Sequence, residues 1–194
     1  MRAFIAIDFD SQIKKQLDDL QRRLRDGPVR LRWTDPAQIH LTVKFLGEVA
    51  AEQVAPIQAA LNDVARGTAP FEVQVGKVGT FPPGGRPRVV WVGVTPVGDG
   101  LMRCRDAVEA AVSPLGFPTE GRAFEPHLTL ARCPDPRAGR EVFAALSPLR
   151  TFDGGVQRVD RLVLYESTLT PYGPRYHRMS EHLLTVNCGH SNEG

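Results

Sequence analysis

Two four-residue stretches of the chain carry the same arrangement of chemistry-bearing residues. Residues 40–43 read His-Leu-Thr-Val, and residues 127–130 read His-Leu-Thr-Leu. In a β-strand, side chains alternate between two faces, so the His and the Thr of each stretch share one face and the apolar residues share the other. Each stretch, called an HxT motif below, therefore predicts a strand that presents one imidazole and one hydroxyl above a buried apolar face.

The paired motifs suit acid–base chemistry on a phosphodiester. Two imidazoles beside one substrate can act as acid and base, because histidine titrates near neutral pH. One His would protonate the departing oxygen and the other would take a proton from water, while the Thr hydroxyls would hold the nonbridging oxygens. This chemistry needs no metal, and the sequence contains no HExxH stretch, carboxylate cluster or Cys pair that would supply a metal site.

Simpler explanations of the motifs compete with catalysis. With 5 His and 11 Thr among 194 residues, about 0.3 His-x-Thr occurrences are expected by chance, and two are found. A single His on a strand is usually structural or exposed, and Thr is common in strands because it is β-branched. Two His could also bind zinc, although no third ligand is evident. The repeat of the whole motif, once in each half of the chain, favours catalysis.

The other candidate polar residues are less informative. Strict alternation places Lys44 on the face of the first motif, where it could contact phosphate or simply be solvated. The remaining histidines have no Thr two positions later. We expect these three, His177, His182 and His190, to lie at the surface or in the tail.

Composition restricts the class of protein. Hydrophobic residues make up 42% of the chain and charged residues 24%, as in soluble globular proteins. No apolar run approaches the roughly 18 residues of a membrane span, and the apolar start is too short for a signal peptide, so we expect a cytoplasmic protein. The net charge of +2 argues against a large nucleic-acid footprint but allows a small phosphate site. Three scattered Cys indicate free thiols.

Strands and helices that could position the motifs follow from apolar spacing. Asp10 or Ser11 can cap a first helix, which Gly27 ends. Further helices are expected over Ala51–Ala65, Asp99–Val112 and Pro136–Leu146. The expected strands are Arg2–Phe9, Val29–Trp33, Ile39–Phe45, Phe71–Val75, Val89–Val94, His127–Arg132, Leu162–Tyr165 and Tyr176–Leu184. Two irregular segments, Phe81–Arg88 and Gly116–Pro126, are expected to be loops.

The order of these elements repeats coarsely. In each half a helix precedes the motif strand, a second helix follows, and an apolar strand comes after, Val89–Val94 in the first half and Leu162–Tyr165 in the second. The two motif histidines are 87 positions apart, close to half the chain. This pattern predicts a bilobal α+β fold built by duplication, with a two-fold axis that brings the motif strands together across a central cleft. We expect residues 1–184 to form a single domain and residues 185–194 a flexible tail.

Both motifs, with their flanks, resemble those of a known superfamily. His40–Gly47 reads His-Leu-Thr-Val-Lys-Phe-Leu-Gly, and His127–Arg132 reads His-Leu-Thr-Leu-Ala-Arg. They resemble the paired motifs of the two-histidine phosphoesterases, above all the RNA 2′,3′-cyclic phosphodiesterases, historically called 2′-5′ RNA ligases. Supporting segments are Arg2–Ile7, Arg86–Gly93 and Leu162–Ser167, so the resemblance covers nearly the whole chain.

The resemblance implies a fold and a set of roles. Each lobe would be an antiparallel sheet with helices outside, and the enzyme would open a 2′,3′-cyclic phosphate to a 2′-phosphomonoester without metal or cofactor. By position, His40 would be the general acid and His127 the general base, with Thr42 and Thr129 on the phosphate. The family also places Arg132 near the phosphate and Phe45 near the base or sugar.

Alternation in the strands conflicts with the last two roles. Phe45 and Arg132 should point away from the motif His and Thr, unless each strand twists or ends there. We expect a monomer that acts on RNA ends or nucleotides, possessing in principle the reverse ligation activity. Alternatives are cleavage of 2′-5′ oligonucleotides or of a cyclic ADP-ribose phosphate, and a noncatalytic RNA- or nucleotide-binding module, which the intact His and Thr pairs disfavour.

Overall fold

The computed structural model describes residues 1–27, 29–170 and 173–185. Within these ranges the α-helices are α1 (Ser11–Arg25), α2 (Ala51–Arg66), α3 (Gly100–Val112) and α4 (Gly139–Leu146). The strands are β1 (Arg2–Asp8), β2 (Arg32–Trp33), β3 (His40–Glu48), β4 (Phe71–Phe81), β5 (Val89–Val97), β6 (His127–Arg132), β7 (Asp153–Val159), β8 (Arg161–Thr170) and β9 (Gly173–Leu183). Residues 186–194, all but the first of the expected flexible tail, lie outside the described residues.

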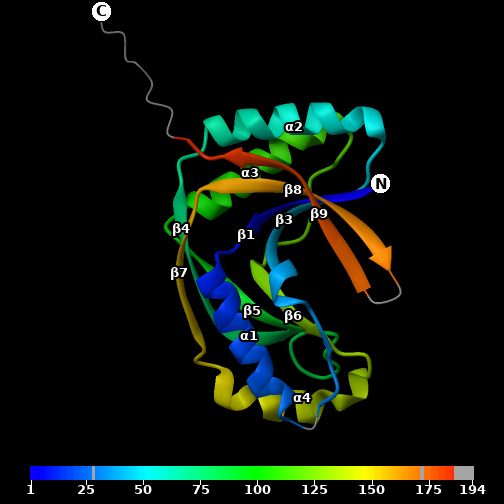
Figure 1. The fold of residues 1–194 in the computed structure, drawn as a ribbon, viewed down its shortest axis with the longest axis vertical. Coiled ribbons are helices and arrows are strands. Elements are labelled where there is room, and N and C mark those ends of the chain that lie inside the picture. Colours follow the sequence, from blue (N-terminus) through cyan, green and yellow to red (C-terminus); the bar gives the residue numbers. More distant parts are fainter. Residues whose placement is uncertain (28, 171–172, 186–194) are drawn as a thin grey trace, which may run out of the picture.

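The strands form an antiparallel sheet with two four-stranded halves. The order along the sheet is β7-β4-β5-β6-β3-β1-β8-β9, and the short β2 pairs with β6. The two motif strands, β3 and β6, lie side by side at the centre, where the halves meet (Figure 1). In each half the motif strand is therefore the innermost strand. The expected α+β fold with two related halves is confirmed.

The two halves correspond strand by strand, but not as the sequence suggested. Moving outward from the centre, β3, β1, β8 and β9 match β6, β5, β4 and β7. Val89–Val97 therefore corresponds to β1, and β8 corresponds to β4. The expected equivalence of Val89–Val94 with Leu162–Tyr165 is wrong. Both runs are apolar, so their composition does not tell them apart. The order of elements along the chain also does not reveal that β4 lies in the sheet half of the second motif strand, β6, and β8 in that of the first, β3.

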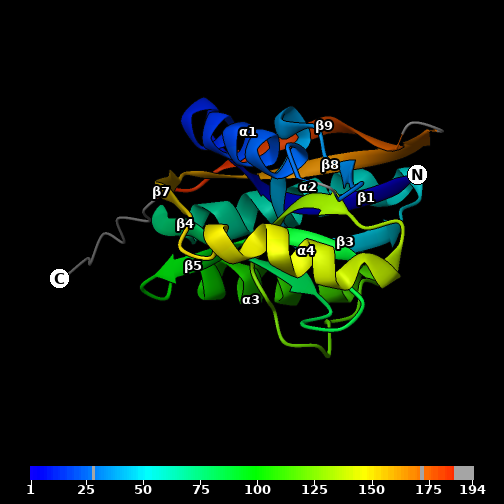
Figure 2. The same ribbon diagram turned by 90° about the horizontal axis from the view of Figure 1, so that it is seen from below.

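The helices cover the two ends of the molecule. α2 packs against β8 and β9, and α3 against β3, β4 and β5, whereas α1 contacts β7. Figure 1 shows α2 and α3 at one end and α1 and α4 at the other, and in Figure 2 α1 and α3 lie at opposite edges. α1 begins as expected, because an Asp10 side-chain oxygen accepts a hydrogen bond from the Ile13 amide at 2.8 Å.

Apolar side chains from both halves bury the inner surface of the sheet. Leu41 in β3 and Leu128 in β6 belong to the same cluster of buried residues as Leu17 of α1, Leu61 of α2 and Val108 of α3. This cluster holds the motif strands from the side opposite the His and Thr side chains. Among the described residues, no helix is both long and apolar enough to cross a membrane.

Candidate active site

The HxT motifs meet through their central leucines. Leu41 of β3 faces Leu128 of β6 in an antiparallel pairing, and both side chains are buried. Because neighbouring strands run in opposite directions, His40 lies across from Thr129 and Thr42 from His127. The structure thus gathers two imidazoles and two hydroxyls on one side of the sheet junction, called the motif face below.

Both motif imidazoles are fixed by the same local hydrogen bond. Nδ1 of His40 lies 2.8 Å from the carbonyl oxygen of Gln38, and Nδ1 of His127 lies 2.7 Å from that of Glu125. A carbonyl oxygen only accepts hydrogen bonds, so each Nδ1 must carry a proton. Each ring is therefore left with Nε2 as the nitrogen that can gain or lose a proton during a reaction.

A β-bulge sits at the same place in both motif strands. The β1–β3 pairing skips Val43 and the β5–β6 pairing skips Leu130, each the fourth residue of its motif. Such a bulge inserts one extra residue and interrupts strict alternation. Val43 and Lys44 are consequently buried in succession, as are Leu130 and Ala131.

The bulges return Phe45 and Arg132 to the motif face. Phe45 is 66% exposed. Its ring lies 6.2 Å from the ring of Phe4, and Phe4 also stacks on His40 at 4.6 Å, so Phe45 and His40 flank the same ring. Arg132 is exposed and lies close enough to influence the pKa of Tyr176, whose ring meets His40 edge-on at 5.0 Å. The conflict between alternation and the two family positions is thereby removed.

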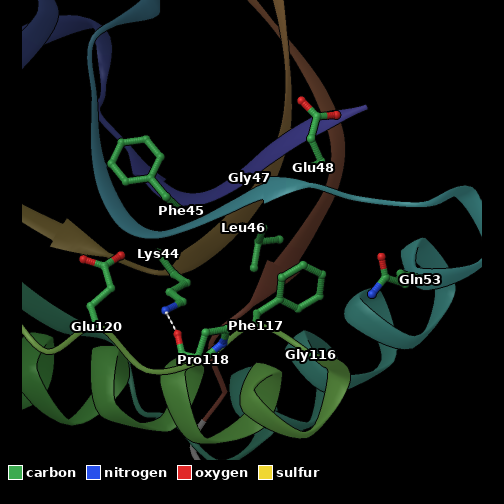
Figure 3. A pocket seen from close by; sticks show the side chains of 10 residues that line it. All are labelled: Lys44, Phe45, Leu46, Gly47, Glu48, Gln53, Gly116, Phe117, Pro118 and Glu120. Atoms are coloured by element: carbon green, nitrogen blue, oxygen red, sulfur yellow. Dashed lines mark hydrogen bonds between the residues drawn. The ribbon is translucent and has the colours of Figure 1, made fainter.

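Lys44 does not lie on the motif face, and its expected placement there is wrong. The same bulge turns its side chain to the opposite side of β3, where it is only 2% exposed. Nζ lies 2.8 Å from Glu109 of α3 and donates a 2.6 Å hydrogen bond to the carbonyl oxygen of Pro118. Figure 3 shows Lys44 and Phe45 pointing to opposite sides of the strand. Lys44 thus anchors the irregular segment 116–126.

A hollow of about 440 Å³ lies beyond Phe45, between the end of β3, the start of α2 and residues 116–120 (Figure 3). Its polar lining includes Glu48, Gln53 and Glu120. The carboxylates disfavour a phosphate in this hollow, because like charges repel. Phe45 is the residue of the motif face, as described above, that also lines this hollow.

Aromatic rings and a charged cluster surround His40. Besides Phe4, the ring of Tyr165 stacks at 5.9 Å. Asp8 faces His40 across β1 and β3. Its carboxylate pairs with Lys14 at 2.6 Å and Arg178 at 2.9 Å, and it accepts a hydrogen bond from the Tyr165 hydroxyl at 3.2 Å. A hollow of about 50 Å³ beside this cluster is lined by His40 and Asp8, among others.

The pKa of His40 lies below its ordinary value of 6.5. Burial is the largest cause, because it disfavours the charged ring. The hydrogen bond to Gln38 and the charge of Asp8 act in the opposite direction, whereas the charges of Lys14 and His127 lower the pKa further. Because the charge of His127 contributes to this pKa, the two imidazoles lie close enough to interact electrostatically.

The surroundings of His127 differ from those of His40. Phe81 meets its ring edge-on at 4.8 Å, and Phe81 occupies in β4 the place that Tyr165 occupies in β8. However, the residue that faces His127 from β5 is Gly93, where β1 presents Asp8 to His40. Only one half of the pseudo-symmetric site therefore places a carboxylate opposite its motif histidine.

Comparison with known proteins identifies the family. A family model described as LigT-like phosphoesterase matches the chain twice, over residues 7–91 and 92–176. The chain belongs to this family. It is a phosphoesterase, and each matched segment contains one HxT motif, which agrees with the expected duplication.

Relatives of this LigT-like phosphoesterase match over nearly their full lengths. An RNA 2′,3′-cyclic phosphodiesterase of Archaeoglobus fulgidus is 35% identical over 91% of this chain and 96% of its own. One of Methanothermobacter thermautotrophicus is 31% identical over 91% of this chain and 95% of its own. A crystal structure of a Thermus thermophilus protein superposes with a TM-score of 0.80 at 29% identity, covering 95% of this chain and 98% of that one.

The expected surface position of His182 is wrong. His182 is buried, not at the surface: Nδ1 lies 2.7 Å from the Asn62 side-chain oxygen and Nε2 2.9 Å from the Ser180 hydroxyl. His177 is exposed as expected, and His190 lies outside the described residues. Cys104 and Cys133 are free thiols, as expected, and both are buried. Cys188 lies outside the described residues.

Sequence reasoning also missed the residues that surround His40. Asp8 ends an apolar strand and Tyr165 lies inside another, so each was interpreted only as part of its strand and not as a candidate site residue. The signal that could have pointed to Asp8 is a carboxylate at the end of an otherwise apolar strand. In the described part of the chain, no three His, Cys, Asp or Glu side chains are grouped to hold a metal ion.

Proposed function

We propose that this LigT-like phosphoesterase opens the 2′,3′-cyclic phosphate at an RNA end to a 2′-phosphomonoester. The observation that carries the proposal is the juxtaposition of two HxT motifs. In each motif Nδ1 is committed to a carbonyl, and Nε2 has no hydrogen-bond partner among the described residues. The printed name of the relatives, RNA 2′,3′-cyclic phosphodiesterase, supplies the substrate class. Both motifs come from one chain, so a monomer suffices.

The proposed reaction is an in-line displacement at phosphorus. Nε2 of His127 takes a proton from water as the water oxygen bonds to phosphorus, and the bond from phosphorus to the 3′ oxygen breaks. Nε2 of His40 gives a proton to that departing oxygen, and solvent later restores both rings. Thr42, Thr129 and Arg132 hold the nonbridging oxygens, on which negative charge grows. No step uses a metal.

The asymmetry of the site supports the division of roles. A general acid must hold a proton before the reaction, and the carboxylate of Asp8 favours the protonated form of His40. Burial is the larger effect and lowers the pKa of His40, so a smaller fraction of the ring is protonated, but the protonated ring is a stronger acid. Gly93 faces His127, so β5 presents no carboxylate to that ring.

Phe45 is proposed to contact the base or sugar of the terminal nucleotide. A largely exposed ring beside the catalytic groups is a stacking platform that every base can use. A 5′-hydroxyl in place of water would attack the cyclic phosphate in the same way, lose its proton to His127 and form a 2′-5′ linkage as the 3′ oxygen departs. By microscopic reversibility the same residues, with exchanged acid and base roles, would cleave that linkage back to the cyclic phosphate.

The proposal is tested by incubating the enzyme with 2′,3′-cyclic AMP in excess EDTA and identifying the product. We expect 2′-AMP to form at an undiminished rate. Formation of 3′-AMP would reverse the assignment of the departing oxygen. Inhibition by EDTA that added metal relieves would contradict the metal-free mechanism. Binding without turnover of cyclic mononucleotides, cyclic-phosphate oligonucleotides and 2′-5′ oligonucleotides would favour a noncatalytic binding module.

A further inference from the structure

A second arginine accompanies Arg132 on the edge of β6. β2 pairs with β6 in an antiparallel register that sets Arg32 directly opposite Arg132 and Trp33 opposite Ala131. Facing residues of an antiparallel pair point to the same side of the sheet, with their Cβ atoms about 4.5–5.5 Å apart. Arg32 therefore shares the face of Arg132, which is the motif face.

Contacts of Trp33 confirm this orientation. Trp33 packs against the buried apolar cluster, and the Arg25 guanidinium of α1 lies 5.1 Å from the centre of its ring. Successive residues of a strand point to opposite sides, so Arg32 points away from α1. Both Arg32 and Arg132 are exposed.

Neither guanidinium is paired within the part of the chain that the structure describes. Among the described residues, Arg32 and Arg132 form no ion pair and no side-chain hydrogen bond, whereas Arg161 and Arg178 both pair with Glu181. Like charges directly opposite each other destabilise a sheet. The Arg32–Arg132 pair is thus unfavourable in the free protein, and a bound anion would relieve the repulsion.

The reacting phosphate does not account for two arginines. A cyclic phosphodiester carries a single negative charge, which Arg132 alone already balances. Arg132 is the β6 residue farthest along the strand from His127, so Arg32 lies beyond the catalytic groups. An RNA chain offers one further phosphate per nucleotide.

We propose that Arg32 binds the phosphate that joins the terminal nucleotide to the rest of the RNA. The inference rests on the proposed function and adds a substrate class to it: RNA ends of two or more nucleotides are preferred over cyclic mononucleotides. Arg32 is a substrate-binding residue. It contacts the RNA backbone and takes no part in breaking the bond between phosphorus and the 3′ oxygen.

The test compares two substrates, 2′,3′-cyclic AMP and the dinucleotide ApA ending in a 2′,3′-cyclic phosphate. For Arg32→Gln we expect kcat/KM to fall roughly tenfold on the dinucleotide and to stay unchanged on the mononucleotide, because only the dinucleotide has the second phosphate. The salt dependence of kcat/KM for the dinucleotide should also weaken. Arg32→Lys should restore part of the loss.

Arg23→Gln on α1 is the matched control, since Arg23 is exposed and lies on a helix away from the motif strands. Equal losses on both substrates, or no loss on the dinucleotide, would overturn the inference. If the wild-type enzyme cleaves neither substrate, the proposed function is wrong, and the role of Arg32 is then tested by binding alone. Binding of ApA 3′-phosphate then decides: roughly tenfold weaker binding by Arg32→Gln than by Arg23→Gln supports the inference, and equal binding overturns it.

Discussion

Leu41 and Leu128 face each other at the junction of β3 and β6, and this single pairing sets each motif histidine across from the threonine of the other motif. The site is therefore shared between the two halves, not duplicated within each. A slip of one residue in either strand would turn the His and Thr of that strand to the buried side.

The shared site predicts that both hydroxyls act in the reaction. Thr42→Val and Thr129→Val keep the side-chain shape and remove one donor from the growing negative charge, so kcat should fall roughly 100-fold in each. Steady-state kinetics on 2′,3′-cyclic AMP measures the loss. Thr95→Val, at an exposed position of β5, is the control and should be unchanged. Losses confined to KM would show that the hydroxyls bind substrate and transition state equally and give no extra stabilisation to the growing charge.

The bulge at Val43 predicts a role for Phe45 that strict alternation would deny. Phe45→Ala should raise KM for 2′,3′-cyclic AMP roughly tenfold, since stacking of a base on an aromatic ring contributes about 1–3 kcal/mol. Leu169→Ala removes an apolar side chain that is also 66% exposed, on β8, and should have no effect. An unchanged KM in Phe45→Ala would place the nucleotide elsewhere.

The buried pair of Lys44 and Glu109 predicts an effect on folding. Lys44→Met leaves the Glu109 carboxylate buried beside only a more distant arginine, so the free energy of unfolding should fall by about 3–5 kcal/mol. Lys44→Met combined with Glu109→Gln should recover much of this loss. Urea denaturation measures both, with the exposed Lys15→Met as control. A Lys44→Met enzyme of unchanged stability that fails to bind nucleotide would instead restore Lys44 to the phosphate site.

The charges beside His40 predict opposite pH shifts. The carboxylate of Asp8 raises the pKa of His40 and the ammonium of Lys14 lowers it. Asp8→Asn should therefore lower the pKa of His40, and Lys14→Gln should raise it, as followed by NMR titration of the imidazole. Where kcat/KM falls because His40 loses its proton, that limb should move to lower pH in Asp8→Asn and to higher pH in Lys14→Gln. Shifts in the same direction would contradict this electrostatic account.

The sequence was sufficient for the elements and the motif pair. Period-two and helical spacing place most helices and strands, and the 87-residue separation of the histidines matches the duplicated family model. These features are local or repeat along the chain, so a single sequence displays them.

What the sequence could not supply depends on contacts between distant segments. The bulge after Thr42 is visible only in the pairing of β3 with β1, and without it alternation assigns Lys44 and Phe45 to the wrong faces. The partner of Lys44, Glu109, lies on α3, and no local pattern links the two. The neighbours of His40 come from β1, β8 and β9, which the sheet order alone brings together.

The most direct test of the paired site is the single-turnover rate of His40→Ala, His127→Ala and the double variant on 2′,3′-cyclic AMP. Each single substitution should slow the chemical step by roughly 10²–10⁴. The double variant should be little slower than the slower single variant, because groups that act as a unit are strongly non-additive. Near-wild-type turnover by either single variant, or losses that multiply in the double variant, would contradict a single site built from both motifs.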